Sequence, residues 1–292
     1  MDLRTLRYFV AVAEERHFGR AARRLHMAQP PLSRSVRQLE AHLGHLLLDR
    51  SPAGVSLTPA GEALYAEAQA LLAHAARIPE RVAAAAGSAT LVMGILADSA
   101  EQIGPHLVTA FRHAHPQVQI RMREADLTDP TCGLRAGQVD VALTRTPFDT
   151  DGIASRVLRT DPVGVVLRSD DPLAQYAGLR LEDLADRRRF QLPDDADPVW
   201  RDFWNAPATG GAVSGPVIRT LRECLQSVLW NGAIGLMPLA DTLPGGLVCV
   251  PLKDMPPSDL VVAWARGTTN PLVRSFLRTV AALPRDGATA SA

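Results

Sequence analysis

Cysteine is scarce in this sequence. Three of its 292 residues are cysteines, and they show neither a C-x-x-C pair nor the spacing of metal ligands: Cys132, Cys224 and Cys249. Cysteines so few and so scattered exclude a small scaffold held together by disulfides. We expect all three thiols to be reduced and to have a structural role, with redox sensing as the alternative.

Long apolar runs are also missing. No stretch reaches the roughly 18 consecutive apolar residues of a membrane-spanning helix. The first residues, MDLRTLRYFVAVAEE, lack the uninterrupted apolar segment of a signal peptide. These absences predict a soluble protein that is located in the cytoplasm and has no membrane partner.

Motifs of catalysis are absent as well. The chain has no G-x-S-x-G elbow, no P-loop, no G-x-G-x-x-G and no H-E-x-x-H. The histidine pairs His42/His45 and His113/His115 have no acidic or cysteine ligand at a suitable spacing. We therefore expect no catalytic residue, no metal and no cofactor. These absences count against two classes of protein, an α/β enzyme joined to a second module and a plain solute-binding carrier.

Neither sign of charge dominates, since 31 basic and 31 acidic side chains leave a formal net charge of zero. Lysine is almost absent, with Lys253 the only one, so arginine abundance by itself says little about function. The distribution says more: residues 1–58 hold nine arginines and five acidic residues, a net charge of +4, which leaves −4 for the remainder. A basic N-terminal segment on an acidic body is typical of a nucleic-acid-binding module joined to another domain.

Apolar residues at helical spacing predict three helices before Gly44. Their apolar faces are Leu3, Leu6, Phe9, Val10 and Ala13, then Phe18, Ala21, Ala22 and Leu25, then Leu32, Val36, Leu39 and Leu43. A short turn at His26–Ala28 precedes the third helix, whose first turn tolerates two prolines. The last two helices match a helix-turn-helix, whose second helix enters the major groove of DNA. From the helical pattern alone, a merely solvated polar face is an equally good interpretation.

A longer string decides between these two interpretations. AARRLHMAQPPLSRSVRQLEAHLG, followed by LLLDR and GVSLTPAGE, resembles the N-terminal signature of the LysR-type transcriptional regulators. The resemblance implies a winged helix-turn-helix at residues 1–58, with the wing at Leu48–Leu57. Many members have a basic residue at the wing tip, where this chain has Ala53. The pair of prolines resembles the subgroup that often controls aromatic-acid catabolism. The DNA-binding residues that we predict are Gln29, Pro30, Pro31, Ser33, Arg34, Arg37 and Arg50, the last as a conformation-fixing or phosphate-contacting arginine.

The segment 59–88 is predicted to be a linker helix with a hinge. Thr58 is a suitable N-cap, followed by Pro59 and Glu62 in the first turn. Pro79 predicts a kink or an early end, with the hinge at residues 83–88. Apolar residues spaced alternately by four and three predict a heptad seam for dimerisation, with packing on its own domain as the alternative: Leu64, Ala68, Leu71, Ala75 and Ile78, continued by Val82. The resemblance implies a dimer through this helix and, commonly, a tetramer.

Beyond Thr90, predicted strands alternate with helices, which indicates an α/β domain with a mainly parallel sheet. The predicted strands are 91–96, 118–122, 139–144, 163–167 and 260–265, and the predicted helices are 104–115, 221–230 and 271–283. GLRAGQVDVALTR, DDPLA and NGAIGLMP resemble further family signatures, although Asp171, Asn231 and Ala233 depart from the usual residues. The resemblance implies a periplasmic-binding-protein-like effector domain at residues 89–292. Subdomain I is expected at about 90–161 plus 268–292, and subdomain II at 162–267.

A ligand cleft is expected between the two subdomains, beyond the carboxyl ends of strands. We hypothesise a small organic anion whose carboxylate binds Arg145 or Arg219 and accepts a hydrogen bond from Ser99. Acidic residues in the same loops leave a cationic or hydroxylated ligand as the alternative. The effector-binding residues that we predict are Asp98, Ser99, Asp126, Leu127, Thr144, Arg145, Pro193, Asp194, Trp200 and Arg219.

Together these features predict a sequence-specific DNA-binding transcriptional regulator and no enzyme. Its promoter binding or activation is expected to be controlled by a small-molecule effector such as an organic or aromatic acid. The expected partners are double-stranded promoter DNA, the effector and further copies of the chain as a homodimer or homotetramer, with RNA polymerase as an additional partner. The resemblance implies a switch in which the effector changes the subdomain angle and the linker helix transmits that change.

Overall fold

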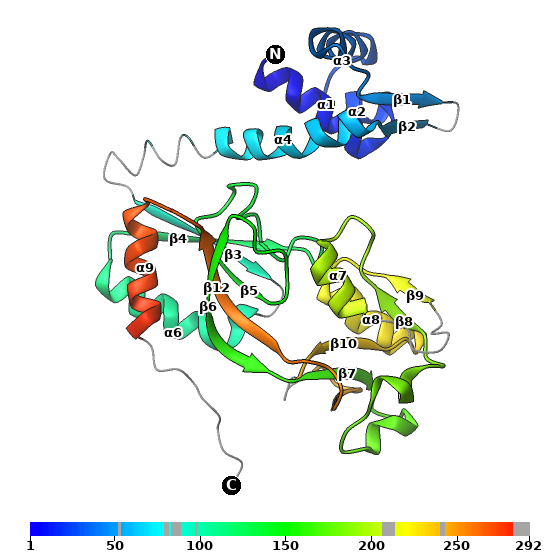
Figure 1. The fold of residues 1–292 in the computed structure, drawn as a ribbon, viewed down its shortest axis with the longest axis vertical. Coiled ribbons are helices and arrows are strands. Elements are labelled where there is room, and N and C mark those ends of the chain that lie inside the picture. The colour runs from blue at the N-terminus through cyan, green and yellow to red at the C-terminus, as the bar shows by residue number, and fades with distance from the viewer. Residues whose placement is uncertain are drawn as a thin grey trace. The chain divides into compact units, whose positions relative to one another are not determined.

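The computed structural model describes residues 1–51, 54–76, 78, 82, 89–96, 99–205, 214–239 and 243–282. The chain divides into two compact units, one made chiefly of residues 1–83 and the other chiefly of residues 84–292 (Figure 1). The two units are described separately. None of the described helices is long and apolar enough to cross a lipid bilayer.

The first unit is a winged helix-turn-helix with one long helix after it. Its elements are α1 (Leu3–Glu15), α2 (Phe18–Arg24), α3 (Gln29–Leu43), the strands β1 (Leu48–Ser51) and β2 (Gly54–Leu57), and α4 (Pro59–Ala76). The two strands pair in an antiparallel hairpin. Gly44 ends α3 with a positive φ of 73°, a conformation that glycine adopts without strain. The predicted helices and the predicted wing are therefore present.

The core of this unit differs from the prediction in the face that α1 buries. Leu6 and Phe9 are buried as predicted, but Ala11 and Val12 complete the buried face. Leu3 is instead 37% exposed and Val10 is half-buried. The buried face is shifted from the predicted stripe and is wider, because α1 packs against α2, α3 and α4 and these neighbours also cover Ala11 and Val12. The buried stripe of α3 follows the prediction, with Leu32, Val36 and Leu39 inside.

A five-stranded sheet forms one half of the second unit. Its strands are β3 (Thr90–Leu96), β4 (Gln119–Ala125), β5 (Val141–Arg145), β6 (Ile153–Asp161) and β12 (Ser258–Ala265), in the order β4-β3-β5-β12-β6. The helices α6 (Ser99–Ala114) and α9 (Pro271–Ala282) contact each other, and their residues Leu107, Phe111 and Phe276 belong to one buried cluster with this sheet. The helix α6 begins at Ser99 and not near Gly104, so Pro105 lies inside it.

The other half of the second unit surrounds a three-stranded sheet, in which β7 (Val163–Arg168) lies between β10 (Gly235–Pro238) and β11 (Leu247–Pro251). A second, two-stranded sheet is formed by β8 (Arg189–Gln191) and β9 (Ser214–Val217). The helices are α7 (Pro198–Asn205) and α8 (Leu221–Asn231), with short 3₁₀ turns at Pro172–Gln175 and Leu181–Leu184. Thr220 and Glu223 form a capping box that begins α8.

Two predictions about the second unit are wrong. The sheets are not mainly parallel: β12 pairs antiparallel with β5 and β6, and β7 pairs antiparallel with β10 and β11. The strand β12 also belongs to the five-stranded sheet, although residues 162–267 were assigned to subdomain II. The chain therefore returns to the five-stranded half at Ser258. There the backbone N–H and C=O groups of β12 form hydrogen bonds with β5 and β6.

Candidate DNA-binding and ligand-binding sites

The exposed face of α3 brings the predicted DNA-binding residues together. Leu32, Val36 and Leu39 turn toward the core, so the opposite side of the helix faces solvent. Gln29, Pro30, Arg34 and Arg37 are exposed there, and Pro31 and Ser33 are half-buried. Neither Arg34 nor Arg37 has an ion pair with a described residue, whereas Arg20, Arg24 and Arg50 each pair with a glutamate. This helix therefore presents two unneutralised guanidinium groups to solvent.

Arg50 is a brace between the wing and α3. Its Nη2 donates to Glu40 Oε2 at 2.8 Å, and its guanidinium carbon lies 5.0 Å from the centre of the Phe18 ring. The other carboxylate oxygen of Glu40 accepts from the backbone N–H groups of Leu47 at 3.1 Å and Leu48 at 3.3 Å. Glu40 is only 6% exposed. Of the two predicted roles for Arg50, these contacts fit the conformation-fixing one.

The wing tip, Ala53 included, lies outside the described residues. So do Pro79 and the predicted hinge at residues 83–88.

The helix α4 packs closely on the first unit at its start. Thr58 Oγ1 accepts from Gly61 N at 3.0 Å, which caps the helix as predicted. A Cβ at Gly61 would lie 2.0 Å from the carbonyl oxygen of Leu47, so only glycine permits this approach.

The predicted heptad seam of α4 is divided in two. Ala68 is 2% exposed and Leu64 packs against the core of the first unit, so both already have neighbours within the chain. Ala75 is half-buried, while Leu71 and Ile78 are 51% and 52% exposed. The face left for a partner is therefore the one around Leu71 and Ile78.

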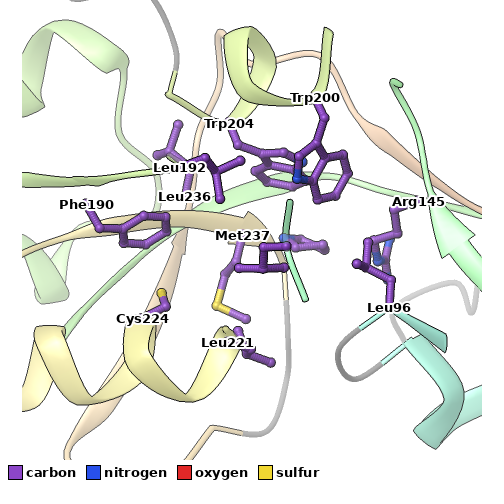
Figure 2. Close-up of a pocket in the computed structure, with 12 residues that line it drawn as sticks. Leu96, Arg145, Phe190, Leu192, Trp200, Trp204, Leu221, Cys224, Leu236 and Met237 are labelled. Atoms are coloured by element: carbon purple, nitrogen blue, oxygen red, sulfur yellow. The ribbon is translucent and has the colours of Figure 1, made fainter. Parts of the chain in front are cut away.

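A pocket of about 60 Å³ lies between the two halves of the second unit (Figure 2). The five-stranded half contributes the residues at or just beyond the carboxyl ends of β3, β4 and β5: Leu96, Leu127 and Arg145. The other half contributes Phe190, Leu192, Trp200, Trp204, Leu221, Cys224, Leu236, Met237 and Pro238. Arg145 is the one charged side chain among these described lining residues.

Three of the predicted effector-binding residues line this pocket, namely Leu127, Arg145 and Trp200. The others that the structure describes do not. Thr144 is fully buried and donates to the carbonyl oxygen of Pro130, and Arg219 forms an ion pair with Asp195 at 2.8 Å. Asp126 caps its own turn through Thr128 N at 2.9 Å, Pro193 is buried elsewhere, and Asp194 is exposed. Asp98 and the side chain of Ser99 lie outside the described residues.

Arg145 is held at the pocket wall by Asp161. Its Nη2 lies 2.7 Å from Asp161 Oδ2, and Arg159 Nε lies 2.6 Å from Oδ1 of the same carboxylate. The guanidinium of Arg145 is thereby fixed on one side, while its Nε and Nη1 are buried and have no hydrogen-bond partner among the described residues. A buried donor without an acceptor costs about 1–3 kcal/mol.

The helix α7 contributes two further buried N–H donors, which belong to the indole groups of Trp200 and Trp204. Trp200 and Trp204 lie one helical turn apart, with ring centres 5.2 Å apart and planes at 64°, and Figure 2 shows them side by side above the pocket. Both Nε1 atoms are buried without an acceptor in the part of the chain that the structure describes. Asp197 positions this helix, because its Oδ1 accepts from Trp200 N at 3.1 Å.

The sequence analysis missed most of the apolar wall. The signal for Trp204 was present, since W-x-x-x-W places two aromatic rings on one helix face. Phe190 had no such local signal: its ring lies against Gly235, where a Cβ would approach it to 1.5 Å. Cys224 also lines the pocket, and burial raises the pKa of its thiol to about 12, so the thiol is neutral near pH 7. Within the described ranges, no three histidine, cysteine or acidic side chains gather as metal ligands.

Comparison with known proteins gives matches to both units. Residues 3–62 match the family model described as "Bacterial regulatory helix-turn-helix protein, lysR family", and residues 84–284 match "LysR substrate binding domain". The transcriptional regulator AlsR of Bacillus subtilis is 33% identical over 207 residues, which are 70% of this chain and 68% of AlsR. The regulator BudR of Raoultella terrigena is 29% identical over 95% of this chain and 99% of its own length.

A similar fold is found in the crystal structure of CbnR, a LysR family transcriptional regulator. It is 23% identical, covers 96% of this chain and 98% of CbnR, and has a TM-score of 0.64. A second structure of CbnR contains its target DNA and has a TM-score of 0.60, with 24% identity over 96% of this chain and 99% of that one. These likenesses establish the fold of the chain.

Proposed function

Because the chain belongs to the LysR family of bacterial helix-turn-helix regulators, we propose that it reads promoter DNA with the exposed face of α3 and responds to a ligand in the pocket between the halves of its second unit. It is a DNA-binding transcriptional regulator with an effector-binding domain, and not an enzyme. The observation that carries the proposal is the solvent-facing side of α3.

The side chains on that face suit base readout. An arginine can donate two hydrogen bonds to guanine O6 and N7, and a glutamine can pair with adenine. Arg34 and Arg37 remain available for such contacts because they have no ion pair with a described residue. Base readout also requires that the wing and α3 keep a fixed geometry. Glu40 and Arg50 hold the wing in place against α3, the helix that would enter the groove.

The pocket supports control by a ligand. Its volume of about 60 Å³ is well below the roughly 150 Å³ of a cavity that accepts benzene. A ring-sized ligand must therefore displace side chains, and the walls come from both halves of the unit. Such a ligand binds an opened arrangement more tightly than the closed one, and this difference in affinity is what a switch requires.

Exposed apolar residues on α4 and just beyond its end support the formation of oligomers. Leu71 and Ile78 lie on one row of the heptad seam and are half exposed. A second copy of α4 would cover them, and two copies of α3 would then read two half-sites of an operator. A dimer, its association into a tetramer, and contact with RNA polymerase belong to this proposal.

The test is DNA binding by variants of the full chain, measured by fluorescence anisotropy. Arg34→Ala is expected to lose about 1–3 kcal/mol of operator affinity and to discriminate less between operator and altered bases. Arg278→Ala is the matched control, because it removes an exposed helical arginine from the second unit. If Arg34→Ala bound the operator as tightly and as selectively as Arg278→Ala, the assignment of the recognition face would be wrong.

A further inference from the structure

The two halves of the second unit also meet away from the places where the chain passes between them. The chain leaves the five-stranded half between β6 and β7, at Pro162, and returns to it between β11 and β12. Figure 1 shows β6 leading into β7 at the lower side of the unit, with α7 above β7. Asp197 stands directly before α7, and it bonds to loops of the five-stranded half. These contacts form a separate connection between the halves.

Asp197 makes this connection through both its backbone and its side chain. Its N–H donates to the carbonyl oxygen of Thr128 at 3.1 Å, and its two carboxylate oxygens each accept from Asp149 N at 3.3 Å. Its Oδ2 also lies 3.6 Å from Nη1 of Arg135. Thr128 and Arg135 precede β5 in the chain, and Asp149 follows it. One residue therefore connects α7 to the segments before and after β5.

The carboxylate of Asp197 is shielded from water, since its side chain is 4% exposed. Phe148 of the five-stranded half and Ala196 of the other half are also buried, and both belong to one apolar cluster with Trp200. Buried polar groups that lose their partners are costly, so breaking the bonds of Asp197 is unfavourable until water reaches it. The ion pair adds less, because Arg135 is half exposed. These contacts therefore resist separation of the halves.

The elements that Asp197 joins are also walls of the pocket. Asp197 Oδ1 accepts from Trp200 N at 3.1 Å and so caps α7, which carries the pocket residue Trp200. On the five-stranded side, the pocket residue Leu127 directly precedes Thr128, the backbone partner of Asp197. Movement of α7 away from this loop would separate Trp200 from Leu127 and widen the pocket.

We propose that Asp197 is a latch, which holds the two halves of the second unit closed and has to be released before the pocket widens. Its backbone and carboxylate hold α7 against the segments on both sides of β5. The inference rests on the proposed function of the pocket, and it adds the contact that opposes opening. Because the latch stabilises the closed arrangement, a signal that opens the unit must offset the bonds of Asp197.

The experiment measures how fast iodoacetamide alkylates each cysteine of the full-length protein, with mass spectrometry to locate the label. Cys224 reports opening, because it lines the pocket, is 1% exposed and reacts as a thiolate, which burial disfavours. Cys249 lies in β11 of the same half and is half-buried, so it reports loosening of that half as a whole. When closing is faster than alkylation, the rate at Cys224 is proportional to the open fraction.

The variant Asp197→Ser separates the latch from the helix cap. Serine caps a helix about as well as aspartate, but it has a single neutral oxygen and that oxygen is needed by Trp200 N. The acceptor for Asp149 N and the charge opposite Arg135 are therefore removed. The alkylation rate at Cys224 is expected to rise about tenfold to a hundredfold.

Two further variants complete the series. Asp202→Ser is the matched control, because Asp202 lies on α7 with its side chain 77% exposed. It is expected to leave the Cys224 rate within about twofold of the parent. Asp197→Asn keeps an oxygen for the cap and loses the charge, so it is expected to raise the Cys224 rate by about threefold to tenfold. Circular dichroism checks folding, and Asp197→Asn decides the question if Asp197→Ser fails that check.

Equal Cys224 rates in the Asp197 variants and in Asp202→Ser would overturn the latch. Equal acceleration at Cys224 and Cys249 would also overturn it, because a residue with a merely structural role would loosen the whole half. The proposed function is tested separately by operator binding. Operator-specific binding together with an unchanged Cys224 rate overturns the latch alone, whereas absence of specific DNA binding overturns the proposed function whatever the Cys224 rate.

Discussion

Removing the carboxylate of Glu40 should loosen the wing of the DNA-binding unit and leave the exposed face of α3, with its predicted DNA-binding residues, unchanged. In Glu40→Ala the buried N–H groups of Leu47 and Leu48 lose their acceptor, and Arg50 loses its ion pair. Each buried amide without an acceptor costs about 1–3 kcal/mol. The side chain of Arg50 is 32% exposed, so water compensates part of the lost pair. The two amides together would cost about 2–6 kcal/mol if both stayed without an acceptor, and water that enters the space left by the side chain reduces this cost, so we expect a total loss of about 2–4 kcal/mol of stability in this unit.

Hydrogen exchange followed by mass spectrometry measures this loss locally. Peptides that cover residues 44–58 should exchange roughly 30- to 700-fold faster in Glu40→Ala, because every 1.4 kcal/mol corresponds to a factor of ten. Asp49→Ala removes an exposed acidic side chain from the same hairpin and should change stability by less than about 0.5 kcal/mol. Glu40→Gln keeps an acceptor for the two amides and should fall between these variants. Equal exchange in Glu40→Ala and Asp49→Ala would refute the idea that this carboxylate holds the wing.

Two further predictions concern assembly and the buried thiols. Leu71→Glu should shift sedimentation velocity toward the monomer, whereas Leu46→Glu, a 70% exposed position outside the seam, should not; equal behaviour of the two would contradict dimerisation through α4. For Cys224, the folded-state pKa of about 12 lies above the ordinary value of 9.0 because of burial. The stability that this thiol contributes is therefore complete below about pH 9 and decreases as the pH rises toward 12. The free energy of unfolding should fall over that window, and Cys224→Ala should reduce the slope; an unchanged slope would count against this assignment.

The sequence predicted the DNA-binding unit well because its signals are local. Caps, prolines and helical periodicity lie within a few residues of each other, and Thr58, Gly44 and the stripe from Leu32 act as expected. The sheet of the second unit was predicted less well. The direction in which β12 pairs, and the half to which it belongs, depend on strands more than 90 residues away in the sequence. One of them is β6, which pairs with β12.

The residues of the ligand pocket were likewise predicted only in part. Arg145 was predicted because it lies at the carboxyl end of a strand that a two-subdomain α/β fold brings to the cleft, and Trp200 because the family resemblance implies an aromatic residue of the pocket at that position. Arg219 has the same chemistry as Arg145 and an equally suitable position along the chain. The structure separates them, since Arg219 is paired with Asp195 in solvent, whereas Arg145 is buried and two of its nitrogen atoms have no acceptor among the described residues. That difference lies in the three-dimensional partners, which no spacing in the sequence reveals.

The most direct test of the account is anisotropy binding of the purified protein to DNA from beside its own gene. The titration is carried out at two salt concentrations, with scrambled DNA of the same length as competitor. The account predicts saturable binding that resists the competitor and weakens steeply as salt rises, because arginines on α3 displace counterions from phosphates while also reading bases. Equal affinity for operator and scrambled DNA, or no binding to either, would contradict it.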